Sequence, residues 1–578
     1  KDLSKEVVVH MKADVTEMEE VVVTGYGQIK KQSFTGSSVT VKKEDLLKVS
    51  QTNVIAALQT FDPSFRIQQN NQWGSDPNRM PKIEIRGKTS VVGLQTEFEN
   101  DPNQPLFILD GVETTLETII NLNMDRVASV TILKDAASTA IYGSKAANGV
   151  IVVETKSPES GQLRLSYSGN YGISFADLSD YNLMNASEKL EYELLAGRYS
   201  PMEGYDGFVD KLQEMQDYYS RLKEVLRGVD TYWLSEPLRV ALVHKHNIYA
   251  EGGDNAVRYG LGVTYNGTDG VMKNSGNDVI GMNFELNYRK GKFRFFNKMS
   301  FDYTKKENPT VNFSEYAKAN PYFEKYDENG NVTRYLEEYY TVNRQHYTVE
   351  NPLYNASLNS YDRQKGMSFI NKFNAEYRPV EEVMVRGRIS LEKKSEKAEY
   401  FLSPEHTSFD GVAQTQRGSY KSTDYDTWIY DGELTVTYGK LFNDVHQLNA
   451  VLGANFRSSE LKTEAFEAVG FPVGDFTRPS FATSFPNGGK PDYTETVTRS
   501  NSWYLNMGYA FDNRYLFDAN IRLDGASVFG SNKRYTETWS VGVAWNIHNE
   551  SFLQNAEWMT LLKVRASIGN PGNQNFDA

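Results

Sequence analysis

Very few residues in this chain of 578 have the spacing that a catalytic or metal site requires. His244 and His246 would share one face of a strand, as two metal ligands could, but no third ligand is near, so we predict a structural or lumen-facing role. Residues 327–331 resemble a calcium loop without its bidentate Glu, and a hairpin turn is the simpler interpretation. No nucleophile elbow, phosphate loop or dinucleotide fingerprint is present, and no spacing among the 75 acidic residues selects a hydrolase pair. The sequence therefore predicts no enzyme, no catalytic residue, no metal site and no cofactor.

The composition narrows the class of protein. The chain has no Cys, which removes disulfides and thiolate metal sites, and its net charge of −13 without a long basic run argues against nucleic acid as a partner. Aromatic residues make up 13%, too many for a disordered chain. No window approaches about 18 apolar residues, so no transmembrane helix is predicted. A closed β-barrel is then the one architecture that would place this chain in a membrane.

From residue 161 onward, polar or small residues alternate with apolar or aromatic ones at the period of a β-strand. The pattern is clearest at 257–265 and 282–288, and it recurs at 293–303, 371–377, 383–391, 448–456, 503–511, 514–524, 539–547 and 562–568. Short turns, as at 512–513, alternate with long connections at 177–244, 307–368 and 460–500. Both alternations are typical of a bacterial outer-membrane barrel. A soluble β-sandwich or propeller is the alternative, but it fits strands joined by such long loops poorly.

A different pattern, with short apolar strands and glycine-containing turns, occupies residues 105–155. Strand-like runs at 106–109, 127–133 and 150–153 are separated by an Asp110-Gly111 turn and by a run of small residues. Upstream, residues 44–59 have helical spacing. We predict a small folded domain that precedes the barrel strands.

The segment at 19–27 is extended, acidic and apolar, and a polar linker follows it at 28–38. Such a segment suits addition to the edge of a partner's sheet, where main-chain hydrogen bonds give affinity. From the pattern alone, an ordinary edge strand of the first domain is the favoured interpretation.

Three segments resemble the SusC/RagA branch of TonB-dependent outer-membrane transporters from Bacteroidetes. They are residues 20–27 (EVVVTGYG), 106–111 (LFILDG) and 129–156 (SVTILKDAASTAIYGSKAANGVIVVETK), and residues 523–530 and 565–574 resemble two barrel signatures of the same branch. The resemblance implies a mostly β fold, in which an N-terminal α/β plug domain lies inside a large antiparallel transmembrane β-barrel of about 22 strands. About twelve or thirteen strands are countable here. We therefore expect the chain to hold only the N-terminal part of the barrel and to be part of a larger protein.

The implied domain order begins with the tail of an immunoglobulin-like extension at 1–18. A TonB box and linker follow at 19–38, the plug at 39–158, and the N-terminal portion of the barrel, with long extracellular loops, at 159–578.

The resemblance also implies functional residues. The TonB box comprises Glu20, Val21, Val22, Val23, Thr24 and Gly25, and the plug signature comprises Asp110, Gly111, Lys134, Asp135, Tyr142, Gly143, Asn148 and Gly149. Outward-facing plug loops would contact the substrate through Asn70, Asn71, Gln72, Trp73, Lys88, Thr89 and Ser90. The indole of Trp73 could stack on a sugar ring beside amides that satisfy hydroxyl groups, or it could pack the loop against the barrel wall.

The implied function is active import of oligosaccharides across the bacterial outer membrane, powered through the TonB complex of the inner membrane. Oligopeptides or an iron chelate are the alternative cargo. A SusD-like surface lipoprotein would cap the barrel, in a dimer of SusC–SusD pairs surrounded by outer-membrane lipid, and no nucleic acid partner is implied.

Overall fold

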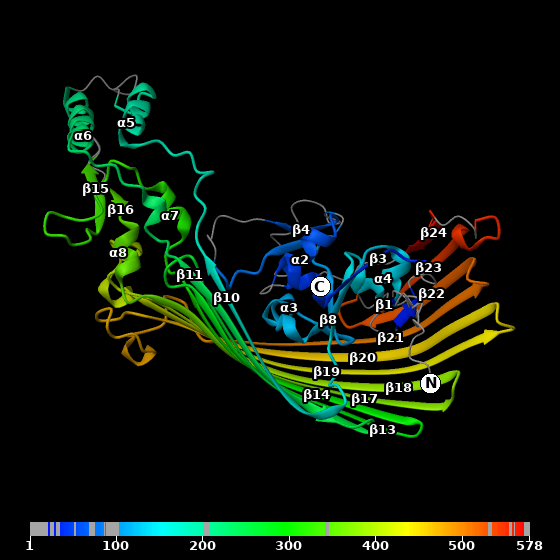
Figure 1. Cartoon of the computed structure of the whole chain (residues 1–578). Coiled ribbons are helices and arrows are strands. Elements are labelled where there is room, and N and C mark those ends of the chain that lie inside the picture. The colour runs from blue at the N-terminus through cyan, green and yellow to red at the C-terminus, as the bar shows by residue number, and fades with distance from the viewer. Residues whose placement is uncertain are drawn as a thin grey trace, which may run out of the picture.

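A long curved sheet and a smaller domain on its concave face make up most of the structure (Figure 1). This computed structural model describes residues 21–23, 28–30, 35–50, 54–68, 76–85, 87, 103–199, 208–340, 346–529, 534–553, 558–559 and 561–570. Helices and a small hairpin project from one end of the sheet, at the left of the view. Among the described residues, no helix is long and apolar enough to span a membrane.

The smaller domain is built on a five-stranded sheet in the order β3-β8-β9-β6-β7. These strands are β3 (Ser38–Lys42), β6 (Leu106–Leu109), β7 (Val112–Thr114), β8 (Val127–Leu133) and β9 (Val150–Thr155). β6 and β9 are parallel, and the other neighbours are antiparallel. β-Branched residues fill β8 and β9, as expected for central strands that are largely buried on both faces.

Two hydrophobic clusters cover the two faces of this sheet. On one face, Val130 and Ile132 pack with Leu46, Ile55 and Ile119 of the helices α1 (Lys43–Val49), α2 (Val54–Phe61) and α3 (Leu116–Asn121). On the other face, apolar residues of β6, β8 and β9 pack against the 3₁₀ helix η4 (Ala140–Ala146). The remaining elements are β4 (Phe65–Gln68), β5 (Lys82–Ile85), η3 (Met124–Arg126) and α4 (Ala136–Thr139). The predicted α/β domain is confirmed.

The candidate TonB box contains a strand that pairs within its own chain. β1 (Val21–Val23) is antiparallel to β2 (Gln28–Lys30). The first three residues of the predicted linker at 28–38 are thus paired with the box strand, and the bounds of box and linker stay a prediction. The other box residues, Glu20, Thr24 and Gly25, lie outside the described residues.

The curved sheet has 13 strands, and each is antiparallel to its neighbours. They are β10 (Gly161–Ser174), β11 (Ala241–Gly253), β12 (Val257–Asp269), β13 (Gly276–Lys290), β14 (Phe293–Asn308), β17 (Tyr361–Val380), β18 (Val383–Leu402), β19 (Ser419–Phe442), β20 (His446–Val469), β21 (Asp492–Phe511), β22 (Tyr515–Ala526), β23 (Tyr535–Asn546) and β24 (Lys563–Asn570). The prediction of a large antiparallel sheet with about twelve or thirteen strands is confirmed.

The outward face of this sheet carries aromatic rings near both of its ends. At the end with short turns, Phe293 stacks on Tyr377 with ring centroids 4.6 Å apart, and Tyr515 stacks on Trp545. Nearer the long-loop end, Trp428 stacks on Tyr430, which is 47% exposed on the outward face. Two aromatic bands on the outer face, with polar residues on the inner one, are the pattern of a sheet that faces lipid.

The predicted strands are too short at the long-loop end, and three strands of the sheet have no predicted range: β10, β19 and, apart from its two histidines, β11. β17 begins at Tyr361, β20 continues to Val469 and β21 begins at Asp492, so the predicted loops at 307–368 and 460–500 are too long. β19 was not predicted; it begins with the mostly polar run at 419–427. A strand that extends beyond the lipid is polar on both faces, so the alternation that identifies strands disappears there.

The two histidines of β11 lie on the outward face of the sheet. His244 and His246 alternate with the buried Lys245, and their neighbours on the same face, Leu242 and Ile248, are exposed. The lumen-facing alternative is therefore wrong. Periodicity shows that His244 and His246 share one face of the strand, but it does not show whether that face points to the lumen or to the lipid. Polar residues also occur on the lipid-facing side, within the aromatic interfacial band, so their polarity does not decide the question.

The connections at the long-loop end carry most of the remaining elements. They are α5 (Ala186–Leu195), α6 (Phe208–Leu226), η5 (Trp233–Ser235), α7 (Phe313–Lys318), β15 (Tyr335–Tyr340), β16 (His346–Glu350), α8 (Pro352–Ser357), η6 (Thr407–Phe409), η7 (Gln414–Gln416) and η8 (Pro479–Phe481), whereas η9 (Ile547–Asn549) follows β23 at the other end. An ion pair of 2.6 Å between Arg221 and Glu337 joins the β10–β11 and β14–β17 connections. The turn predicted at 327–331 is confirmed: Asp327 accepts a hydrogen bond from the Asn331 N–H at 2.8 Å.

Candidate functional site

The smaller domain contacts the curved sheet through the turn between β6 and β7. Asp110 (φ 50°) and Gly111 (φ 78°) both have left-handed backbone, as a tight Asp-Gly hairpin turn requires. The Asp110 carboxylate accepts a hydrogen bond from the Lys298 ammonium of β14 at 2.7 Å. Lys372 of the adjacent strand β17 donates to the Leu109 carbonyl at 2.9 Å. Two neighbouring strands of the sheet therefore hold one turn.

These lysines also keep Asp110 charged. Burial alone would raise the pKa of Asp110, but the charges of Lys298 and Lys372 and hydrogen bonds from Lys298 and the Thr155 N–H outweigh burial and hold the pKa at about 2. The side chains of Asp110 and Lys298 are 17% and 13% exposed, so water screens their attraction only in part. At neutral pH the contact is a charge-assisted hydrogen bond, the stronger class.

Helix α3 and the turn after it add a second group of ion pairs. Glu117 pairs with Lys306 of β14, and it lies 3.6 Å from the ammonium of Lys394 on β18. Arg126 pairs with Glu285 of β13, and both side chains are at most 9% exposed. Removing one partner of such a buried pair leaves an uncompensated charge and costs roughly 3–5 kcal/mol.

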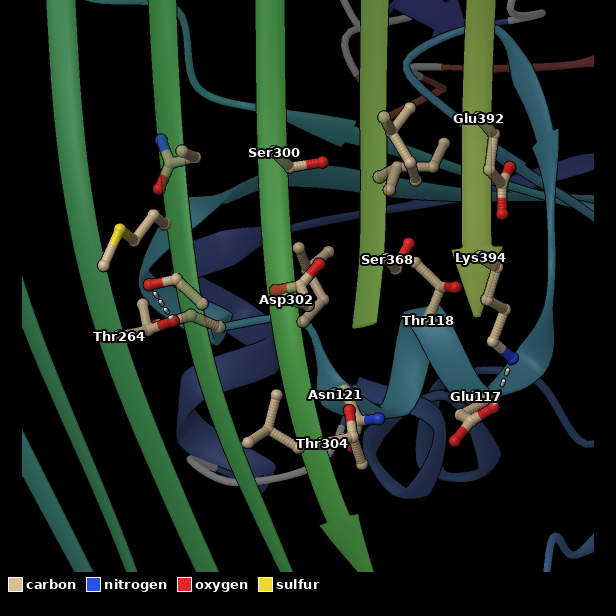
Figure 2. A pocket seen from close by; sticks show the side chains of 18 of the residues that line it. Glu117, Thr118, Asn121, Thr264, Ser300, Asp302, Thr304, Ser368, Glu392 and Lys394 are labelled. Carbon is tan, nitrogen blue, oxygen red and sulfur yellow. Dashed lines mark hydrogen bonds and ion pairs between the residues drawn. The ribbon is translucent and has the colours of Figure 1, made fainter. Parts of the chain in front are cut away.

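A cavity of about 180 Å³ lies between α3 and the inner faces of β12, β13, β14, β17 and β18 (Figure 2). Many of the side chains around it are neutral hydrogen-bonding groups: Thr118, Asn121, Thr264, Ser300, Thr304 and Ser368. Glu117, Lys394, Glu392 and Asp302 add charge to the lining. The cavity has room for several water molecules, and its walls can solvate polar groups.

A glycine brings η4 against the sheet at a second place. Gly143 has φ 72°, and a Cβ there would lie 2.1 Å from the Asp524 carboxylate of β22 and 2.6 Å from Arg522 Nε. The missing side chain leaves room for the Asp524 and Arg522 side chains against the Gly143 backbone. Arg522 donates to the Ile141 carbonyl at 2.9 Å, and the Ser144 N–H donates to Asp524 at 3.2 Å.

The chain that enters the smaller domain is also held by the sheet. The Thr35 N–H donates to Asp518 of β22 at 3.2 Å, and Arg565 of β24 donates to the Gly36 carbonyl at 2.6 Å. Thr35 is 2% exposed, and a Cβ on Gly542 of β23 would lie 2.5 Å from its hydroxyl oxygen. We call this set of contacts the N-terminal latch. In the chain, the latch follows the candidate TonB box and the β1–β2 hairpin and precedes β3.

Known proteins share this arrangement. Residues 30–150 match the TonB-dependent Receptor Plug Domain family. The chain is 26% identical, over 98% of its length, to TonB-dependent receptor P26 of Formosa agariphila and to TonB-dependent receptor SusC of Bacteroides thetaiotaomicron. A structure of the RagAB peptide importer in the "open-open" state is 21% identical and has a TM-score of 0.77, over 96% of this chain and 61% of that one. The chain belongs to the SusC/RagA-type TonB-dependent transporters.

In this SusC/RagA-type chain, the smaller domain is the plug and the 13-stranded sheet is the barrel wall that surrounds one side of it. The chain spans about half the length of the curated relatives it matches, at 54% of both P26 and SusC. The likeness extends to iron transporters at the level of fold alone: the ferric citrate transporter FecA is 11% identical, with a TM-score of 0.52, over 89% of this chain and 61% of that one.

The predicted signature residues of this SusC/RagA-type plug divide into two groups. Asp110, Gly111 and Gly143 form the loops that meet the barrel wall. The others stabilise the plug itself: Lys134 pairs with buried Asp62 at 2.8 Å, Asp135 accepts a hydrogen bond from the Ser37 N–H at 2.6 Å, Tyr142 and Asn148 are buried, and Gly149 has φ 92° in the turn before β9. The structure therefore places three of the eight residues, Asp110, Gly111 and Gly143, at the contact between the plug and the barrel wall, which we call the gate.

The predicted substrate-contacting residues are not among those that the structure describes. They are Asn70, Asn71, Gln72, Trp73, Lys88, Thr89 and Ser90. Their role in cargo binding stays a prediction.

Sequence reasoning missed the barrel partners of the plug, among them Lys298, Lys372, Glu285, Lys306, Asp518, Arg522, Asp524 and Arg565. In the sequence they are polar residues on the inner face of amphipathic strands, like many others. Asp524 and Arg565 fall within segments that carry the family resemblance, which was the one available signal. In general, a charged residue that stands among small polar residues on the inner face of a barrel strand would be the sequence feature that indicates a contact with the plug.

Proposed function

We propose that the protein carrying this chain imports an oligomeric nutrient across the bacterial outer membrane, with energy supplied by the TonB complex of the inner membrane. The way in which the plug is attached carries this proposal. The buried apolar clusters belong to the plug, to the wall or to its loops, whereas ion pairs and hydrogen bonds join plug to wall. Such contacts can break one at a time, so the plug is closed at rest and movable under load.

The proposed path of force begins at the box, residues 20–25, where TonB would pair as an added strand. The N-terminal latch would yield first, followed by the hydrogen bond between Ser37 and Asp135. Strand β3 would yield next, since it lies at the edge of the plug sheet and pairs only with β8. The central strands of the plug could remain folded while its N-terminal part is withdrawn.

For the cargo we propose oligosaccharides. The hydroxyl and amide groups around the cavity beside α3 are the groups that exchange hydrogen bonds with sugar hydroxyls. Oligopeptides are the second candidate, because the RagAB neighbours are described as a peptide importer. An iron chelate is the remaining alternative.

The family also supports a proposal for partners. A SusD-like surface lipoprotein would cap the barrel on its long-loop side, and two such pairs would form a dimer. The relative named SusC and the RagAB neighbours support the lipoprotein partner.

Deleting residues 21–25 in the full-length protein tests the proposal. Binding of cargo, measured by calorimetry against a panel of oligosaccharides and peptides, should be unchanged, whereas uptake of the bound compound into cells should stop. Deleting residues 12–16 is the matched control and should leave both unchanged. Continued uptake without residues 21–25 would refute TonB-dependent import, and the compound bound from the panel decides between the cargo classes.

A further inference from the structure

Three lysines lie directly opposite one another on the outward face of the barrel wall. In the strand registers, Lys305 of β14 is paired with Lys365 of β17, and Lys365 is paired with Lys397 of β18. Like charges directly opposite across a sheet destabilise it unless another group compensates them. We call these three residues the lysine row.

Acidic residues compensate only the two outer members. Lys305 pairs with Glu307 at 2.7 Å, and Lys397 pairs with Asp424 at 3.3 Å. Lys365 is exposed between them, and within the described part of the chain no ion pair joins it to a carboxylate. The ammonium of Lys365 therefore has the two cations Lys305 and Lys397 as its nearest neighbours along the row, and it is exposed to water.

The lysine row lies immediately beyond the apolar band of the wall. On β14, the outward-facing side chains of the lipid-facing band run from Phe293 to Tyr303, and Lys305 is the next residue on that face. These ten residue steps span about 33 Å along the strand, or about 25 Å in height at a typical tilt, which is the height of the lipid-facing band in such barrels. Lys305 follows at the long-loop end, so the row lies at the level of lipid headgroups.

A neighbouring cation is also placed as an interfacial anchor. The ammonium of Lys393, on the same face of β18, lies 4.6 Å from the ring centroid of Trp428. Aromatic rings with adjacent cations are typical of the membrane–water boundary. In the strand register Lys393 lies opposite Phe369, four residues before Lys397, so the lysine row lies on the long-loop side of this anchor.

We propose that the lysine row binds a phosphate group of an anionic lipid headgroup in the leaflet on the long-loop side of the membrane. A phosphate presents several strong acceptor oxygens, so it can accept hydrogen bonds from Lys365 and from one outer lysine that turns inward. It removes the repulsion within the row. This inference rests on the proposed outer-membrane location and is independent of cargo and of TonB.

Native mass spectrometry of the detergent-purified full-length protein, titrated with diphosphoryl lipid A and separately with phosphatidylcholine, tests this site. Each basic residue near a membrane surface contributes about a fivefold change in lipid affinity, so the K305Q/K365Q/K397Q variant should bind lipid A about 100-fold more weakly. The matched control K290Q/K292Q/K440Q makes the same charge change at the short-turn end, where all three lysines are exposed, and should bind as wild type.

Three results would overturn the site: equal loss in both variants, no loss in K305Q/K365Q/K397Q, or wild-type protein that binds lipid A no better than phosphatidylcholine. Thermal unfolding followed by circular dichroism shows that both variants are folded. The site can fail this test while uptake still depends on the box, so its failure is distinguishable from failure of the proposed function.

Discussion

Replacing Asp110 by Asn would remove one charge from the plug side of the gate while keeping the shape of the side chain. A carboxyl group whose pKa lies at about 2, against 3.8 for a free Asp, is stabilised in its charged form by about 2 kcal/mol despite burial, and the Lys298 and Lys372 charges of the wall contribute most of this. The ammonium of Lys298 would still have Glu285 at 3.7 Å, so it would not lose every counter-charge. We therefore expect the variant to weaken the attachment of the β6–β7 turn by about 2 kcal/mol, less than the roughly 3–5 kcal/mol for a buried pair that loses one partner, because Lys298 keeps a counter-charge.

Hydrogen exchange of the β6 and β7 amides measures this attachment directly in the purified protein. Exchange through local opening should be about 30-fold faster in D110N, since about 1.4 kcal/mol corresponds to a factor of ten. The matched control is D45N, which makes the same chemical change in the exposed pair of Asp45 with Lys48, whose side chains are 48% and 73% exposed. Exposed pairs contribute little, so D45N should leave these amides within about twofold of wild type.

The reasoning is refuted if D110N and D45N exchange alike. A cycle with K298M gives a second test, because Asp110 and Lys298 act on one contact. The double variant should then be less destabilised than the sum of the two single ones. Additive effects would show that the ion pair does not hold the turn.

Three further predictions concern the plug. Gly143→Ala should speed exchange in residues 140–146 by more than tenfold, because its Cβ would meet the Asp524 carboxylate. The control is Gly197→Ala, which has φ 80° and no atom within 4 Å of its Cβ, so it should show only the cost of the backbone conformation. Equal effects of the two variants would exclude the contact with β22. Burial tends to raise the pKa of Glu113, but Arg457 and Lys145 hold it at about 2, as Lys298 holds that of Asp110. Carboxyl groups with depressed pKa values stabilise docking above about pH 4, and this stabilisation is lost as the pH falls toward 2. Exchange of the β6–β7 amides, corrected for the intrinsic rate, should therefore be constant from pH 5 to 8 and rise below about pH 4. A rise near neutral pH would contradict this expectation. Trp73→Ala should weaken cargo binding in calorimetry without affecting barrel assembly, and unchanged affinity would remove Trp73 from the binding site.

The plug strands could be predicted from the sequence because buried strands of this kind are short, continuous runs of apolar residues. The runs at 106–109 and 127–133 coincide with β6 and β8, and the run at 150–153 begins β9. The Asp110-Gly111 turn was predictable for a different reason, since few residue pairs tolerate left-handed backbone at both positions. Local rules of burial and turn geometry were sufficient here.

The gate itself could not be predicted from the sequence, because its contacts join residues that are far apart. Asp110 and Lys298 are 188 positions apart, and Arg522 and Ile141 are 381 positions apart. The barrel partners are single charged residues on polar faces, and alternation shows only that they face inward. The same limit explains why the lumen-facing prediction for His244 and His246 was wrong: alternation does not show which side a face points to, and these polar side chains lie on the lipid-facing side.

The most direct test of a plug that must leave the wall for transport is to lock the N-terminal latch. A Cβ at Gly542 would lie 3.2 Å from the Thr35 Cβ, close to the separation of about 3.8 Å in disulfides, and this chain has no Cys of its own. The account predicts that T35C/G542C, once oxidised, binds cargo normally but does not import it, that reduction restores uptake, and that T35C alone imports as wild type. Uptake at the wild-type rate with the disulfide intact would contradict the account.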